Sequence, residues 1–147
     1  MKSLHTQIEI AAPPDRVWKI LTNFAAYQEW NPFIRNAVCP IFKVGERMEI
    51  ALLPPGGEGW TFAPTLMVVH PERELRWLGR FIFPGVFDGE HCFTIESLDN
   101  HRVRLVQSEN FRGLLVPFFG QMLEKTRAGF EEMNHALKMR AESSLVL

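Results

Sequence analysis

The stretch AAPPDRVWKILTNFAAYQEWNPF, residues 11–33, decides the fold that this sequence predicts. It follows residues 4–10, where apolar and polar side chains alternate with the period of a strand that has one wet face. The prolines at 13 and 14 suit the first turn of a helix, whose N–H groups have no partner within the helix. A second short helical segment is expected at 24–30, before a Trp-Asn-Pro-Phe turn, because a residue that precedes proline avoids the helical conformation.

The rest of the chain alternates with a period of two until its last segment. Strands are expected at 35–41, 47–53, 60–69, 74–81, 87–96 and 102–111. Pro64 lies inside the third of these and predicts a bulge or a sheet edge. Apolar residues then recur every three or four positions and predict one amphipathic helix from Leu115 to about Arg140.

This order of elements predicts an α+β fold. Successive strands joined by short turns form an antiparallel sheet, and the first strand is expected to close against the end of the run. The C-terminal helix must bury its apolar stripe on the concave face of that sheet. The expected architecture is therefore a curved antiparallel sheet of about seven strands wrapped on a long C-terminal helix, with two short helices after the first strand. Residues 1–147 are expected to form one domain.

Composition narrows the function classes. The formal net charge is −1, which argues against a nucleic-acid binder, since such proteins usually carry a basic stripe. The two cysteines, Cys39 and Cys92, lack partners at metal-ligand spacing, so reduced thiols and no metal site are expected. The sequence shows neither a signal-peptide pattern nor an apolar run long enough to cross a bilayer. We therefore expect a cytoplasmic protein without stable membrane insertion.

Particular residues point to a known family. They are Ile8-Glu9-Ile10-Ala11-Ala12-Pro13, Val17-Trp18, Leu21-Thr22-Asn23-Phe24, Tyr27, Trp30-Asn31-Pro32-Phe33, Gly45-Glu46, Leu75-Arg76-Trp77, Gly89-Glu90-His91, Glu109-Asn110-Phe111-Arg112-Gly113, Phe130-Glu131-Glu132-Met133-Asn134 and Leu137-Lys138. With them, nearly the whole chain resembles the helix-grip superfamily, also called START-like or SRPBCC, which includes polyketide cyclases and lipid-transfer domains. The resemblance implies a deep apolar cavity between the sheet and the last helix. It leaves the function open, because carriers, cyclases, dehydrases and regulators share this scaffold.

Strand parity places three polar residues on otherwise apolar faces. His91 falls in phase with the inward residues of 87–96, and Gln107 and Glu109 do so in 102–111. His91 and Glu109 are the candidate catalytic residues, because a histidine and a glutamate close together can transfer protons in an aldol-type cyclisation or a dehydration. The alternative is structural, with His91 hydrogen-bonded to Glu109 or a buried water so that the pair fixes the cavity shape.

Aromatic residues of the strands and the last helix can serve as core and as ligand wall in a fold with a hollow core. The predicted ligand-binding residues are Trp60, Phe62, Trp77, Phe81, Phe87, His91, Phe93, Gln107, Glu109, Phe119, Met122 and Phe130. The turns at 54–57 and 83–86 are predicted lids at one end of the cavity, and residues 11–33 are expected to shape its floor and entrance.

Arginine positions divide by parity. Arg76, Arg80, Arg102 and Arg104 alternate with inward apolar residues, which predicts that they lie on the solvated convex face. Arg35 and Arg112 could instead rim the mouth of the pocket and hold a carboxylate or a phosphate.

Three functions follow from these observations. The first is binding of a hydrophobic small molecule, such as a lipid, quinone, polyketide or aromatic compound, by a monomer or homodimer without a cofactor. The second is an enzyme of the cyclase or dehydrase type that uses His91 and Glu109 for proton transfer. The third, a domain that binds a protein partner, predicts an exposed apolar patch outside the cavity, and no sign of such a patch is visible in the sequence.

Overall fold

The computed structural model describes residues 1–81 and 83–143. The strands are β1 (Lys2–Ile10), β2 (Ile34–Val38), β3 (Glu49–Leu52), β4 (Trp60–Phe62), β5 (Thr65–His70), β6 (Glu74–Arg80), β7 (Asp88–Asp99) and β8 (Arg102–Arg112). The helices are α1 (Pro14–Thr22), α2 (Tyr27–Trp30) and α3 (Gly120–Glu142), with single 3₁₀ turns η1 (Phe24–Ala26) and η2 (Val116–Phe118). The predicted helix-grip architecture is confirmed.

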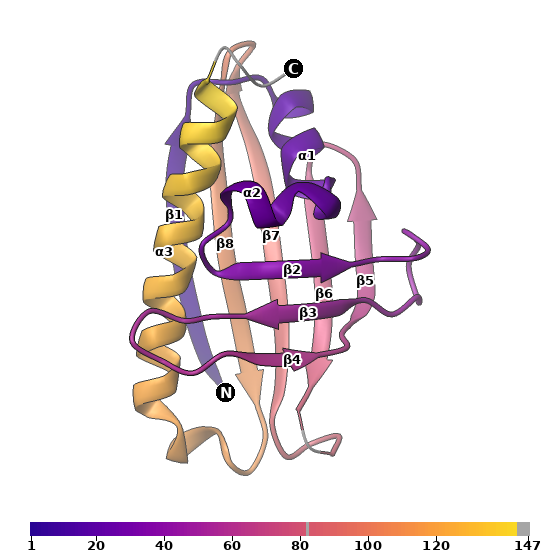
Figure 1. Cartoon of the computed structure of the whole chain (residues 1–147), viewed down its shortest axis with the longest axis vertical. Coiled ribbons are helices and arrows are strands. Elements are labelled where there is room, and N and C mark those ends of the chain that lie inside the picture. The colour runs from indigo at the N-terminus through magenta and orange to yellow at the C-terminus, as the bar shows by residue number, and fades with distance from the viewer. Residues whose placement is uncertain (82, 144–147) are drawn as a thin grey trace.

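The strands form two sheets where one was expected. A five-stranded antiparallel sheet has the order β1-β8-β7-β6-β5, and a three-stranded sheet has the order β2-β3-β4. Figure 1 shows the smaller sheet crossing in front of the larger one, with α3 along one side. The predicted strand at 60–69 is divided at Pro64 into β4 and β5, which belong to different sheets. Proline has no N–H for a ladder, so the chain leaves one sheet there and enters the other.

Closure of β1 against the end of the strand run is also confirmed. The ladder between β1 and β8 extends from Lys2 opposite Phe111 to Ile10 opposite Val103. Inward side chains of β8 are buried in strict alternation, and those of β1 follow the same parity with Ile8 half-buried. The larger sheet thus presents one apolar face to α3, α1 and the smaller sheet.

The last helix starts later than its periodicity predicts. Residues 116–118 form the 3₁₀ turn η2, and α3 starts at Gly120, because Pro117 lacks an N–H and Phe119 has a non-helical backbone. The buried stripe of α3 consists of Leu123, Thr126, Gly129, Phe130, Met133, Asn134, Leu137 and Ala141. None of the described helices is long and apolar enough to cross a membrane.

Two side chains fix the path of residues 11–33. Tyr27 is fully buried, and its hydroxyl donates a hydrogen bond to the carbonyl of Leu21 near the end of α1. The Oδ1 atom of Asn31 accepts hydrogen bonds from the backbone N–H groups of Phe33 (3.0 Å) and Ile34 (2.9 Å). These contacts end α2, turn the chain into β2 and direct Phe33 towards α3.

Candidate functional site

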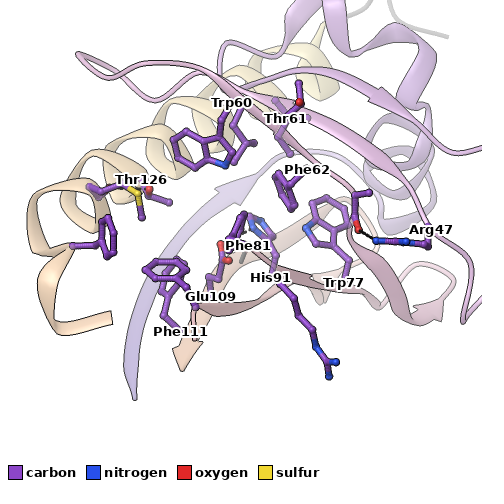
Figure 2. A pocket seen from close by; sticks show the side chains of 17 residues that line it. Arg47, Trp60, Thr61, Phe62, Trp77, Phe81, His91, Glu109, Phe111 and Thr126 are labelled. Atoms are coloured by element: carbon purple, nitrogen blue, oxygen red, sulfur yellow. Dashed lines mark hydrogen bonds and ion pairs between the residues drawn. The ribbon is translucent and has the colours of Figure 1, made fainter. Parts of the chain in front are cut away.

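A cavity of about 510 Å³ lies between the two sheets and the first turns of α3 (Figure 2). Cavities that bind small molecules are commonly of this size. The lining residues are Ile34, Arg47, Leu52, Trp60, Thr61, Phe62, Ala63, Trp77, Arg80, Phe81, Phe87, His91, Glu109, Phe111, Phe119, Met122 and Thr126. Most of these side chains are aromatic or aliphatic, so the wall offers an apolar surface with a few polar groups.

Nine of the twelve predicted ligand-binding residues line this cavity: Trp60, Phe62, Trp77, Phe81, Phe87, His91, Glu109, Phe119 and Met122. The structure places the other three, Phe93, Gln107 and Phe130, behind the ring of His91 and outside the lining. Strand parity correctly gave the inward direction of Phe93 and Gln107, and helical spacing gave that of Phe130 on α3. They contact His91 and do not face the cavity.

Several lining residues were missed by sequence reasoning. Thr126 follows Met122 by one helical turn, so the spacing of α3 could have indicated it. Arg80 was expected on the convex face, but it ends β6 and is among the residues that line the cavity. Arg47 precedes β3 and pairs with Thr65 in an isolated bridge, a long-range contact without a local signal.

Other expectations about the cavity rim are not met. Arg35 donates to the carbonyl of Asn31 and Arg112 contacts the sulfur of Met1, and neither lines the cavity. The turns at 54–57 and 83–86 do not line the cavity but border it: Pro54 and Gly57 share a hollow with the lining residues Trp60, Phe119 and Met122, and 83–86 lies between the lining residues Phe81 and Phe87. The lining excludes the whole of 11–33. The short helices therefore do not form the floor or the entrance of the cavity. Phe33, at the end of this stretch, packs edge-on against Phe130 at 5.6 Å.

His91 and Glu109 meet on the cavity wall, and Figure 2 shows their side chains together. Nδ1 of His91 lies 3.1 Å from Oε1 of Glu109, and Nε2 lies 3.0 Å from Oε1 of Gln107. Trp77 stacks on the imidazole with ring centroids 5.0 Å apart and an angle of 25° between the planes. All three polar residues are buried, with at most 8% of the surface of any of them exposed. The histidine is therefore held on both ring nitrogens and on one face.

A chain of hydrogen bonds determines which nitrogen of His91 carries a proton. Thr6 donates to the carbonyl of Gln107 (2.7 Å), so its oxygen must accept from Nδ2 of Asn134 (2.8 Å). Oδ1 of Asn134 then accepts from Nε2 of Gln107 (2.7 Å), which also donates to the carbonyl of Phe130 (3.3 Å). This leaves Oε1 of Gln107 facing His91, so Nε2 of His91 must be an N–H donor.

One consequence concerns the contact between His91 and Glu109. Because Nε2 of His91 is committed as a donor, only one further proton lies between Nδ1 and the carboxyl group of Glu109. The pair exists either as imidazolium with carboxylate or as neutral imidazole with carboxylic acid, and both forms have zero net charge. Both ring nitrogens of His91 are occupied by these contacts, whereas Glu109 has a second carboxyl oxygen, Oε2. Through Oε2, Glu109 can pass that proton to a ligand or take one from it.

A glycine leaves room for this carboxyl group. Gly89 lies on β7, and a Cβ atom there would come within 2.2 Å of Oε2 of Glu109. The carboxyl group of Glu109 thus lies against the backbone of β7, in space that is open only because residue 89 is a glycine. Gly89 is one of the residues that carry the family resemblance, but the sequence predicts no role for it in the site.

A comparison with family profiles identifies the chain. The profile described as "Polyketide cyclase / dehydrase and lipid transport" matches residues 1–142. The chain belongs to this family. The predicted resemblance to START-like proteins is thereby confirmed. No curated protein is similar enough in sequence to count as a relative.

Solved structures similar to this polyketide cyclase/dehydrase and lipid transport family member include an aromatase/cyclase. The Zhui aromatase/cyclase from Streptomyces sp. R1128 has a TM-score of 0.78 and 18% identity over 96% of this chain and 93% of that one. A START superfamily protein from Mycobacterium smegmatis has a TM-score of 0.72 and 22% identity over 95% and 97%. Norcoclaurine synthase from Thalictrum flavum has a TM-score of 0.71 and 15% identity over 94% and 92%. At these identities the likeness concerns the fold.

The geometry of this family member adds two residues to the predicted site. Thr6 and Asn134 are buried and complete the network that orients Gln107 and His91. A polar residue in phase with the apolar side of a strand or helix was the available signal for both. Among the described residues, no group of three or more His, Cys, Asp or Glu side chains lies close enough to hold a metal ion.

Proposed function

We propose that this protein binds a hydrophobic small molecule, of the lipid, quinone, polyketide or aromatic class, in the cavity between the two sheets and α3. The observation that carries the proposal is a cavity of about 510 Å³ with a largely aromatic wall and a single carboxyl group, that of Glu109. Apolar contact supplies affinity, at about 25 cal/mol for each Å² removed from water before the costs of association.

The polar groups on the wall favour a ligand with a particular layout. Through Oε2, Glu109 can accept a hydrogen bond from a hydroxyl group of the ligand, or donate one to a carbonyl group when it is protonated. Arg80 lies at the exposed side of the lining and can contact a carboxylate or phenolate. A fused or extended aromatic compound with oxygen substituents at both ends meets these requirements better than a plain hydrocarbon chain.

Titration of the purified protein with a panel of probes tests this proposal. The panel contains a naphthol, a naphthoquinone, a flavonoid and a fatty acid, and quenching of tryptophan fluorescence reports binding, because Trp60 and Trp77 line the cavity. Mass spectrometry under native conditions identifies any ligand that co-purifies. We expect saturable binding of at least one aromatic probe.

Two matched variants locate the binding. Met122→Trp fills part of the cavity and is expected to weaken binding by about tenfold or more, since a bulkier side chain occupies ligand volume. Met139→Trp makes the same change on the same helix at an exposed position and is expected to leave affinity unchanged. Equal affinity in both variants, or no binding by any probe and no co-purifying ligand, would contradict the proposal.

The contact between His91 and Glu109 favours a second candidate function, that of a cyclase or dehydrase. In that reaction the carboxylate of Glu109 takes a proton from a carbon next to a ligand carbonyl, and the resulting enolate carbon bonds to a second carbonyl. The new alkoxide regains the proton from Glu109, and loss of water gives the dehydrated ring. His91 stabilises each charge state of Glu109 through its Nδ1 atom.

A β-hydroxyketone and a linear polyketone surrogate test this candidate. Turnover is expected to disappear in Glu109→Gln and in His91→Ala, while both variants still bind an aromatic probe. If wild-type protein binds the surrogates and releases them unchanged, binding is the function and the catalytic candidate is wrong.

A further inference from the structure

Exposed apolar side chains gather at one end of the molecule. Phe83 in the turn between β6 and β7 is 69% exposed, and Leu114 and Phe118 in the connection from β8 to α3 are 80% and 79% exposed. Both connections lie at the bottom of Figure 1, beside the start of β1. We call Phe83, Leu114 and Phe118 the end patch. The sequence showed no sign of an exposed apolar patch, and that expectation is corrected here.

The two connections that carry the end patch are joined to each other. The N–H of Leu114 donates to the carbonyl of Gly85 (3.2 Å), and the N–H of Leu115 donates to the carbonyl of Val86 (3.1 Å). Gly113 has φ of 132°, and a Cβ there would come within 2.2 Å of the oxygen of Val86. The two connections that carry the end patch are therefore held together by hydrogen bonds. Only a glycine at position 113 allows them to approach so closely.

Basic residues flank the end patch. Arg80 and Arg112 lie within three residues of it in the sequence, Lys125 shares a surface hollow with Phe118, and Lys2 lies opposite Phe111 at the start of β1. Among the ion pairs of the described residues, none involves any of these four cations. The acidic residues in the neighbourhood are Glu58, Asp88 and Glu124, and Glu124 already contacts Arg127 at 3.6 Å.

The end patch also borders the cavity. Phe119 follows Phe118 directly, lines the cavity, and packs edge-on against Phe87 at 5.2 Å. Arg80, the last residue of β6 before the other connection, lines the cavity as well. A surface that covers the end patch therefore also meets the rim of the cavity.

We infer that the end patch docks on the surface of an anionic phospholipid membrane. Apolar side chains on the tips of connections can enter the boundary between headgroups and acyl chains, while flanking cations contact the anionic headgroups. A second copy of this chain is the less suitable occupant, because a two-fold contact through the patch would bring two sets of unpaired cations together. The inference does not depend on which ligand, if any, fills the cavity.

Vesicle sedimentation with the full chain tests this inference. The protein is mixed with vesicles of phosphatidylcholine alone or of phosphatidylcholine with phosphatidylglycerol, and the bound fraction is measured. Wild-type protein is expected to bind the anionic vesicles and to lose most of that binding in high salt, because salt screens the headgroup attraction. No sedimentation with either vesicle would overturn the inference.

Paired variants separate the end patch from general stickiness. The double variant Leu114→Ser with Phe118→Ser is expected to partition about tenfold less onto anionic vesicles, because two inserted side chains are lost. The double variant Val44→Ser with Met139→Ser removes exposed apolar side chains elsewhere and is expected to bind like wild type. Equal loss in both pairs would overturn the inference.

Two further measurements complete the test. Phe118→Trp is expected to show a blue-shifted emission and quenching by brominated lipid when anionic vesicles are added, whereas Val44→Trp shows neither. This reporter keeps the test valid if the serine variants fold poorly. Sedimentation velocity in the absence of lipid measures the oligomeric state. Membrane docking would be overturned in favour of self-association by two results together: wild-type protein that forms a dimer but binds no vesicles, and loss of that dimer in the Leu114→Ser, Phe118→Ser variant.

Discussion

Phe33 lies so close to Gly129 that a Cβ atom on this glycine would stand 2.3 Å from Cδ1 of the ring. The ring also meets Phe130 edge-on, with centroids 5.6 Å apart. The Trp-Asn-Pro-Phe turn and the middle of α3 are thus joined through a position where the helix has no side chain. This contact connects residues 11–33 to the helix that carries the back of the His91 site.

Gly129→Ala is expected to destabilise the protein despite the higher helix propensity of alanine. The propensity gain is about 1 kcal/mol, whereas forcing an atom into the volume of a buried ring costs about 1–3 kcal/mol or more. Urea denaturation followed by circular dichroism measures the change in the free energy of unfolding. Gly120→Ala is the control, because a Cβ there meets nothing within 4 Å. A stabilised Gly129→Ala variant would show that Phe33 moves aside easily.

Gly89→Ala is expected to separate Glu109 from His91. The new methyl group would occupy the place of Oε2, so the carboxyl group must turn away and Nδ1 of His91 loses its partner at 3.1 Å. Nitrogen NMR of the imidazole follows the change, and the affinity for an aromatic probe is expected to change with it. Gly57→Ala serves as the control, because a Cβ there makes only ordinary contacts at 3.5 Å or more. An unchanged Nδ1 signal in Gly89→Ala would contradict this account.

Asn134→Leu and Thr6→Val are expected to be non-additive. Each removes one member of the buried network and leaves a polar neighbour without a partner, which costs about 1–3 kcal/mol in the free energy of unfolding. The double variant is expected to cost less than the sum of the single variants, because the direct Thr6–Asn134 hydrogen bond is lost in both. A double-mutant cycle from urea denaturation measures the coupling, and strict additivity would refute the network.

Tyr27 offers a prediction about pH. It is the chain's single tyrosine, and burial raises the pKa of its hydroxyl far above the ordinary value. The folded protein therefore holds this proton where the unfolded chain releases it, so stability is intact below about pH 10 and falls above it by up to about 1.4 kcal/mol per pH unit. Tyrosinate absorbance is expected to appear only as the protein unfolds.

Tyr27→Phe is the matched comparison for this behaviour. It is expected to lose about 1 kcal/mol at neutral pH, because the carbonyl of Leu21 loses a hydrogen-bond donor. Above pH 10 its stability should fall less steeply than that of wild type. Rapid ionisation of Tyr27 in the folded wild-type protein would show that the hydroxyl is accessible and would contradict the prediction.

The fold could be predicted from sequence to the extent that its signals are local. Alternation in β7 and β8 correctly gave the inward direction of His91, Gln107 and Glu109, because each side chain of a strand points opposite to its neighbours. The division into two sheets at Pro64 could not be predicted from the sequence. A proline marks an interruption, but whether the chain bends within one sheet or enters another depends on distant strands.

The site was less predictable, because its residues are brought together by contacts between distant parts of the chain. Thr6 and Asn134 are joined by a hydrogen bond although they lie 128 positions apart, and no local pattern pairs them. Arg80 has outward parity but is the last residue of its strand, where the alternation ends, and it lies among the residues that line the cavity. Phe118 was expected in the apolar stripe of the last helix and Phe83 in a turn, so no local pattern indicated that they would share one surface.

The pairing of β1 with β8 has a consequence for how the protein is made. Thr6 reaches its backbone partner at Gln107 only after 101 further residues have been added to the chain. On the ribosome, β1 therefore stays an unpaired strand while these residues are added, exposed to wrong partners. Contacts of such long sequence separation also slow folding, since the loop between them must close first. Because Thr6, Gln107 and Asn134 come together in that last step, the candidate site forms no earlier than the completed sheet.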